Sequence, residues 1–261
     1  MRIALGLEYD GNAFCGWQSQ PSGCGVQDHL EKALTAFADR PVSVIAAGRT
    51  DTGVHATAQV VHFDTDAVRE DHAWVRGPNS HLDPRVRVLW ACPVADEFHA
   101  RFSAVSRTYH YLLLDDPVAP GALSGRLGWF HKPLDVAAMA EAAAMFLGEH
   151  DFGAFRSAEC QAKSPVKLMH EARVERRSNL IVFTFRASAF LHHMVRNLVG
   201  SLVYVGAERL DAEGLAKVFA SRDRRTAAPT FAPDGLYLAA IEYDSRFALP
   251  APRPFPLFTF P

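Results

Sequence analysis

Short strand-like segments alternate with helical ones along this chain, and two of the strand-like segments are separated by a single tight turn. A two-residue hydrophobic period, typical of a half-buried strand, occurs at residues 3–9 and 42–46. Residues 171–176 and 180–185 flank Arg177-Ser178-Asn179, which predicts a hairpin. Further strands are expected at 59–63, 86–92, 108–114 and 237–243. Hairpin-linked strands interleaved with helices predict mixed α/β layers and argue against a doubly wound parallel sheet.

Helical periodicity and capping residues indicate four helices between these strands. Residues 26–37 place their apolar side chains on one helical face. Asp135 is a suitable N-cap for the segment that follows it, and Gly148 a suitable stop. The segment 190–206 is apolar around most of its circumference, so we expect it to be buried. Asp211 can cap a last helix that reaches about Ser221.

A shift in charge divides the chain of 261 residues near residue 100. Residues 1–100 contain more acidic than basic side chains, whereas the remainder is slightly basic, although the net charge of the whole is −2. We therefore predict an N-terminal domain over 1–103, a C-terminal domain over 104–245, and a tail rich in proline and phenylalanine over 246–261. A polarised chain can carry a basic face for a nucleic acid, but solvated surface charge explains the same pattern.

Several classes of protein are disfavoured by what the sequence lacks. No apolar run approaches the ~20 residues that span a bilayer, and the N-terminus is typical of a strand rather than a signal peptide. The four cysteines form no metal-binding pattern, so we expect reduced thiols in a cytoplasmic protein. The motifs GxSxG, GxxxxGK[ST], GxGxxG and HExxH are all absent. Adjacent histidines on a helix, such as His192 and His193, point in different directions, and we predict no bound metal.

The segment Gly48-Arg49-Thr50-Asp51-Thr52-Gly53-Val54-His55 combines charge with two glycines at the end of a predicted strand. Its glycines permit backbone angles that other residues avoid, which predicts a tight and well-defined turn. Asp51 at its centre could serve as a catalytic carboxylate. It could equally accept hydrogen bonds from nearby backbone amides in an Asx turn, and the spacing alone does not decide between these roles.

Six segments, in the same order along the chain, resemble the tRNA pseudouridine synthases of the TruA family. They are "EYDGNAFCGWQSQP" with the following "GVQDHLEKAL", "AAGRTDTGVHATAQVVHF", "FHARFSAVSRTYHYLL", "GEHDFGAFR" and "FLHHMVRNLVGSLVYVG". The resemblance covers nearly the whole chain. It implies two α/β domains that share an extended, largely antiparallel sheet, with helices packed on it and a central cleft. It also implies a cofactor-free isomerase that acts as a homodimer on uridines 38, 39 and 40 of the tRNA anticodon arm.

The same resemblance assigns roles to four residues. Asp51 matches the family's catalytic aspartate, Tyr109 the tyrosine that contacts the base, and Arg196 the arginine of the helix motif. Arg49 matches the arginine that helps to hold RNA and the flipped base. None of the catalytic positions departs from the family, although "APTFAPDGLYL" and "PNSHLDP" do. We expect Arg196 to pair with Asp51, because an unpaired charge on an apolar helix is costly; the alternative is that Arg196 reaches water.

Further RNA contacts are expected from basic and aromatic residues. Lys163, Arg222 and Arg224 belong to the basic groups of the second half and could bind phosphates. Phe14 and Trp17 lie in a glycine-bounded loop and could touch RNA, or they could form a small core cluster. Two other functions remain open at this point: a tRNA-binding or folding factor without catalysis, and a pseudouridine synthase that acts on another RNA.

Overall fold

The computed structural model describes residues 1–253 and divides into two compact units. Of the described residues, the first unit comprises 1–105 and 237–253, and the second comprises 106–236. The sequence predicted that the second domain would reach residue 245. The structure differs because the strand that begins at Leu236 pairs with a strand of the first unit from Tyr237 onward. Part of the predicted tail, residues 254–261, lies outside the described residues.

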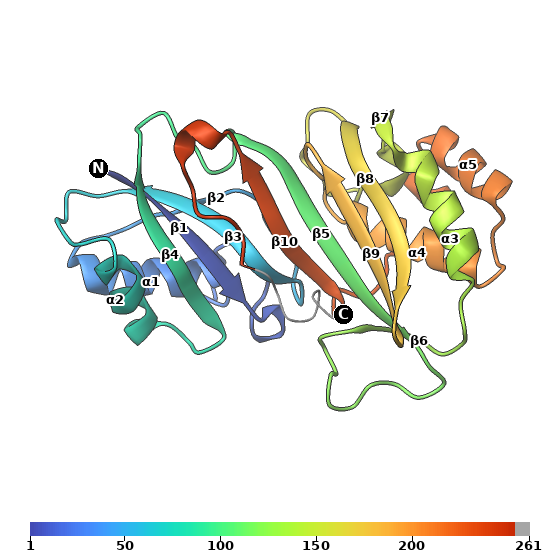
Figure 1. Ribbon diagram of the computed structural model, residues 1–261, viewed down its shortest axis with the longest axis horizontal. Helices are drawn as coiled ribbons and strands as arrows, with labels where there is room; N and C mark the ends of the chain where they lie inside the picture. The colour runs from blue at the N-terminus through green and yellow to red at the C-terminus, as the bar shows by residue number, and fades with distance from the viewer. Residues whose placement is uncertain (254–261) are drawn as a thin grey trace. The chain divides into compact units, whose positions relative to one another are not determined.

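Ten strands and five α-helices form the regular structure of the described residues (Figure 1). The strands are β1 (Arg2–Tyr9), β2 (Ile45–Ala46), β3 (His55–Asp64), β4 (Val86–Val94), β5 (Ala104–Asp115), β6 (Gly128–Phe130), β7 (Gly148–Asp151), β8 (Val166–Arg177), β9 (Leu180–Ala187) and β10 (Leu236–Tyr243). The helices are α1 (Val26–Ala38), α2 (Ala73–His81), α3 (Val136–Ala143), α4 (Met194–Gly206) and α5 (Ala212–Ser221). The predicted mixed α/β class, with largely antiparallel strands, is confirmed.

The sheet of the first unit has the strand order β4-β1-β3-β10, with the short β2 beside β3. The β1–β3 and β1–β4 pairs are antiparallel, whereas β10 runs parallel to β3. Most residues of β1 are buried on both faces, although its pattern predicted a half-buried strand. One reason is that the indole of Trp90, from β4, lies where a side chain on Gly6 would be. The predicted strand at 42–46 is shorter, because the amides of Val42 and Val44 donate to side chains of α1.

Helices α1 and α2 pack against each other, and α2 also packs on β4. Helix α2 was not predicted from the sequence, because its Gly77-Pro78 pair is typical of a break. Gly77 is required there because any side chain would collide with the ring of Phe37 on α1. Phe37 and Phe63 both pack edge-on against Trp74, which is buried. This aromatic contact joins the helices to β3.

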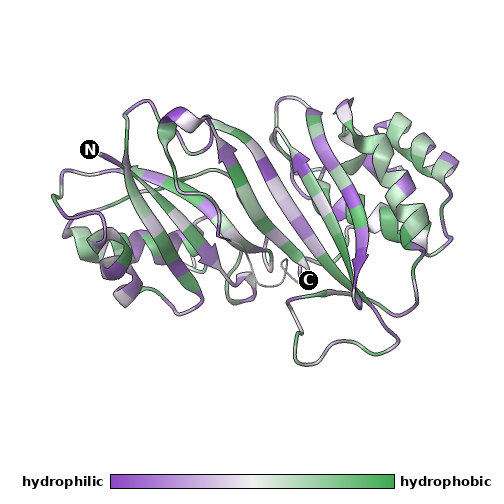
Figure 2. Cartoon of the chain, in the orientation of Figure 1, coloured by the Kyte–Doolittle hydropathy of each residue, from purple (hydrophilic) through white to green (hydrophobic). Residues whose placement is uncertain are grey.

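The second unit has the strand order β5-β9-β8-β7, with β6 parallel to β5. The predicted hairpin is confirmed: β8 and β9 pair antiparallel across a turn in which Ser178 has a φ of 56°. Asp135 and Asp211 cap α3 and α5 as predicted, each accepting from a backbone amide three residues later. Helices α3, α4 and α5 are largely hydrophobic (Figure 2), and the ring of Phe219 on α5 contacts three buried phenylalanines, Phe146, Phe152 and Phe155.

The cysteines differ from the expectation of reduced thiols. Cys15 and Cys24 form a disulfide that closes a loop in the first unit, with their Cα atoms 5.4 Å apart. Cys92 and Cys160 are free thiols. The pairing was not evident from the sequence, because nine positions separate the two cysteines and only the fold of the loop brings them together. Among the described residues, no helix is long and apolar enough to cross a membrane.

Candidate active site

The turn that contains Asp51 is held by main-chain hydrogen bonds on both sides of the aspartate. The carbonyl of Thr50 accepts a hydrogen bond from the amide of Trp17 at 2.9 Å, and the carbonyl of Asp51 accepts one from the amide of Val54 at 3.1 Å. Gly53 has a φ of 80° and Gly16 a φ of 89°, angles that favour glycine. The predicted tight turn is observed, although of Gly48 and Gly53, the two glycines from which it was predicted, only Gly53 has a positive φ. The loop that contains Gly16 packs directly on the turn.

Buried polar side chains support the same turn from the sheet. The hydroxyls of Tyr9 on β1 and Thr50 lie 2.8 Å apart in a buried hydrogen bond. The fully buried Gln59 of β3 donates to the carbonyl of Gly48 at 2.8 Å, which holds the start of the turn. Burial raises the pKa of Tyr9 to about 12, so its hydroxyl remains protonated at neutral pH. These contacts make the turn a rigid extension of the sheet.

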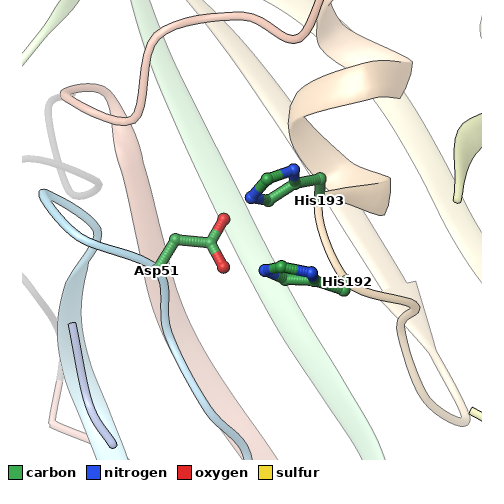
Figure 3. A group of neighbouring side chains, drawn as sticks. All are labelled: Asp51, His192 and His193. Carbon is green, nitrogen blue, oxygen red and sulfur yellow. The ribbon is translucent and has the colours of Figure 1, made fainter. Parts of the chain in front are cut away.

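The side chains at the tip of the turn differ in exposure. Asp51 is half-buried and lies on the segment that leads into β3 (Figure 3), whereas Arg49 and Thr52 are exposed. His55, the first residue of β3, is buried and stacks on the ring of Tyr237 at 4.6 Å. Its Nδ1 accepts from the amide of Gly11 at 3.1 Å. The turn thus presents a carboxylate and a guanidinium from a backbone that is fixed at both ends.

Tyr109 lies in the second unit, in the middle of the long strand β5. It is opposite Phe185 in the β5–β9 ladder, and its ring packs edge-on against that of Phe190 at 5.0 Å. Only 8% of Tyr109 is exposed, compared with none of Tyr111. Tyr109 therefore belongs to the core of the second unit, although it is slightly more exposed than Tyr111.

Arg196 lies in the first turn of α4, also in the second unit, and is half-buried. Its Nε donates to the carbonyl of Phe231 at 2.8 Å, and the amide of Phe231 donates back to the carbonyl of Arg196 at 3.2 Å. The helix begins at Met194, four residues later than predicted, because His193 adopts a left-handed backbone with a φ of 62°. His192 and His193 therefore lie in the turn before α4 (Figure 3), and their rings are 4.0 Å apart.

The predicted RNA contacts fall into two groups. Arg49, Lys163 and Arg222 are exposed, and Arg222 also forms an ion pair with Asp151. Phe14 and Trp17 are only 4% and 2% exposed, so the direct RNA contact expected of them does not fit this structure. They form the core cluster that the sequence left open: the ring of Phe14 packs on His29 and that of Trp17 on Tyr9.

Arg224 and Asn197 belong to one hydrogen-bonded cluster in the second unit. The guanidinium of Arg224 points inward and donates to the side-chain oxygens of Asn197 and Thr230 at 3.2 and 3.0 Å. Asn197 is fully buried on α4. Asn197 was not predicted from the sequence as a functional residue, although a polar side chain in an otherwise apolar helix was the available signal. A buried amide of this kind needs hydrogen-bond partners, and the cluster supplies them.

Comparisons with known proteins agree on one family. A family model described as tRNA pseudouridine synthase matches residues 7–103 and 142–244, which include the 48–55 turn and Arg196. The chain is 60% identical over 252 residues to tRNA pseudouridine synthase A of Paraburkholderia xenovorans (strain LB400), covering 97% of this chain and 93% of that protein. It is 62% identical over 250 residues to the protein of the same name from Aromatoleum aromaticum, covering 96% and 95%.

Proposed function

The chain belongs to the tRNA pseudouridine synthases and is an isomerase of uridines in tRNA, and we propose that Asp51, Tyr109 and Arg196 perform this isomerisation. The substrate that we propose is the anticodon stem-loop, at positions 38, 39 and 40. The observation that carries the proposal is the turn of Asp51, whose backbone is hydrogen-bonded on both sides while the carboxyl group remains partly exposed. A preorganised carboxylate of this kind is suited to act on a sugar.

The reaction requires no redox partner, because its bonds and electrons balance within the substrate. The bond between N1 of uracil and C1′ of the ribose breaks, the base rotates, and a bond forms between C5 and C1′. The C5 proton is lost and N1 gains a proton, so the product is an isomer of the substrate. A carboxylate can stabilise the cation-like sugar, attack it at C1′, or accept a proton from the ribose. We assign this part of the reaction to Asp51.

Tyr109 and Arg196 have complementary parts in the proposal. The ring of Tyr109 stacks on the rotated base, and its hydroxyl assists removal of the C5 proton. The fixed position of Tyr109 in the β5–β9 ladder supports this role, because a stacking ring works best from a rigid element. The guanidinium of Arg196 pairs with the carboxylate of Asp51. Its bond to the carbonyl of Phe231 supports this role by restricting the plane of the guanidinium.

The target uridine is stacked in RNA and must leave the stack to reach a carboxylate, at a cost of a few kcal/mol. We propose that Arg49, which is exposed beside Asp51, holds the flipped nucleotide. Lys163 and Arg222, also exposed, would bind phosphates of the tRNA. By likeness to the family, the enzyme acts as a homodimer in the cytoplasm and needs no cofactor.

The test uses unmodified tRNA that carries tritium at C5 of its uridines. The wild-type protein should release tritium into water, and Asp51→Asn should release none while still binding tRNA. Asp71→Asn, which removes an exposed carboxylate elsewhere in the same unit, is the matched control and should remain active. Full turnover by Asp51→Asn would refute the assignment. Release from tRNA mutated at 38, 39 and 40, or from messenger or ribosomal RNA alone, would refute the proposed substrate.

A further inference from the structure

The segment 227–231 of the second unit has no regular secondary structure, yet it forms the hydrogen bonds that hold Arg196. Phe231 is bonded twice to Arg196, through its carbonyl to Nε and through its amide to the main-chain carbonyl. The position of the guanidinium therefore depends on where residue 231 lies. A segment without a backbone ladder needs side chains to fix it.

Three polar side chains provide this fixation. The hydroxyl of Thr230 donates a hydrogen bond to Oδ1 of Asn197 at 2.7 Å. Nη2 of Arg224 donates to both Oδ1 of Asn197 and Oγ1 of Thr230. The Nη1 of Arg224 donates to the carbonyl of Ala227 at 3.2 Å. Asn197 is anchored in turn, since its Nδ2 donates to the carbonyl of Phe155 at 2.8 Å. The donors and acceptors are mutually consistent, because the hydroxyl of Thr230 donates one bond and accepts another.

Close backbone packing adds to these bonds. A side chain on Gly200 of α4 would collide with the carbonyl of Pro229, so the segment lies directly against the helix. Asn197 and Arg196 are neighbours on α4, with Asn197 fully buried and Arg196 half-buried. Burial also lowers the pKa of Arg224, as expected for a guanidinium that points inward. Asn197, Arg224 and Thr230 together hold the segment 227–231 in place, and we call these three residues the clamp. Asn197 is the neighbour of Arg196 in the sequence.

We propose that Asn197, Arg224 and Thr230 are positioning residues for Arg196. They act by holding the segment 227–231, and the inference rests on the proposed function of Arg196. Arg224, which the sequence placed among the RNA contacts, thereby has a role inside the enzyme. The clamp orients the guanidinium before the substrate arrives, so its loss should slow turnover more than it weakens tRNA binding.

The variant Thr230→Val removes the hydroxyl at nearly constant volume, and Thr230→Ser restores it. Tritium release should show kcat reduced by about tenfold or more in Thr230→Val, with KM and the Kd for tRNA nearly unchanged, and substantial recovery in Thr230→Ser. Thr226→Val is the matched control, because the hydrogen bonds described for the hydroxyl of Thr226 are to Ser221 and Asp223, outside the segment 227–231. This variant should keep the wild-type kcat. An unchanged kcat in Thr230→Val would overturn the proposal.

A double variant separates this inference from the proposed function. If Thr230 acts through Arg196, adding Thr230→Val to Arg196→Met should lower kcat no further than Arg196→Met alone. If the fold-reductions in kcat of the two single variants multiply in the double variant, the inference is overturned, and the role of Arg196 is left intact. Full turnover by Arg196→Met would instead refute the proposed function itself.

Arg224→Lys provides an independent measurement if Thr230→Val does not fold. The lysine retains the charge but cannot reproduce the planar set of donors that reaches Ala227, Asn197 and Thr230. If Arg224 positions Arg196, Arg224→Lys should have a lower kcat than wild type, and its tRNA binding should depend on salt as that of wild type does. A changed Kd for tRNA with unchanged kcat would overturn it in favour of a phosphate contact.

Discussion

Gly16 provides a sharp test of whether the turn of Asp51 must be rigid for catalysis. It has a φ of 89°, and a Cβ placed on it would lie 2.9 Å from the carbonyl oxygen of Thr50 and 3.1 Å from the amide nitrogen of Thr52. The neighbouring amide of Trp17 donates to that same carbonyl. Gly16→Ala therefore pushes on the backbone on both sides of Asp51, without removing any proposed catalytic group.

Two costs contribute to the expected effect. An alanine at positive φ costs about 1–2 kcal/mol, and overpacking against backbone adds about 1–3 kcal/mol. The free energy of unfolding should fall by about 2–5 kcal/mol in total. The contact is relieved by moving the carbonyl of Thr50, which carries Asp51 with it. Because small displacements of a catalytic group are costly, kcat should fall by about ten- to hundredfold.

Urea unfolding measures the stability, and tritium release from C5-labelled tRNA measures kcat. Gly23→Ala is the matched control, because Gly23 lies in the same loop with a φ of 70° but a side chain there would meet nothing within 4 Å. It should lose only about 1–2 kcal/mol of stability and retain its kcat. An equal kcat in both alanine variants would refute the view that contact with Gly16 keeps the turn in a productive position.

Reduction of the disulfide should lower the free energy of unfolding by about 2–3 kcal/mol, because Cys15 and Cys24 close a short loop, with nine positions between them in numbering. Urea unfolding of Cys24→Ser should then be insensitive to reductant. Burial lowers the pKa of His62 to about 4, so the unfolded chain binds this proton more readily than the folded one. Stability should therefore fall as the pH drops from about 6.5 towards 4, and His62→Asn should make the fall shallower in unfolding curves recorded across that range. Arg49→Ala should weaken tRNA binding and reduce the slope of log Kd against log salt by about one, whereas an unchanged slope would argue against a phosphate contact.

Local sequence signals predicted most of the secondary structure, because they depend on neighbours along the chain. The caps at Asp135 and Asp211 and the hairpin after Arg177 are examples. Helix α2 was missed for a non-local reason, because its Gly77 is required by contact with the ring of Phe37 on α1. The late start of α4 is local: its N-cap, His193, has a left-handed backbone that the apolar pattern did not indicate.

The candidate site shows the same division. Gly48 and Gly53 indicated a tight turn, and the turn is present, although only Gly53 has a positive φ. The burial of Trp17 and Phe14 could not be inferred, because a glycine-bounded loop can face either solvent or a neighbouring segment. Nor could the inward orientation of Arg224, since its partners, Asn197 and Thr230, are brought to it only by the packing of α4. The three proposed catalytic residues came from the family resemblance and remain predictions.

The parallel pairing of β10 with β3 has a consequence for how the protein is made. The ring of Tyr237 stacks on His55, four residues after Asp51, so the base of the turn is completed by a residue that lies much later in the sequence. The ribosome finishes residues 1–105 long before Tyr237 exists, by roughly 7–26 s at about 5–20 residues per second. A nascent chain stalled before residue 237 should therefore contain the aspartate but lack a finished support for it. The turn would then gain its full support only after residue 237 has been made, well after Asp51 itself.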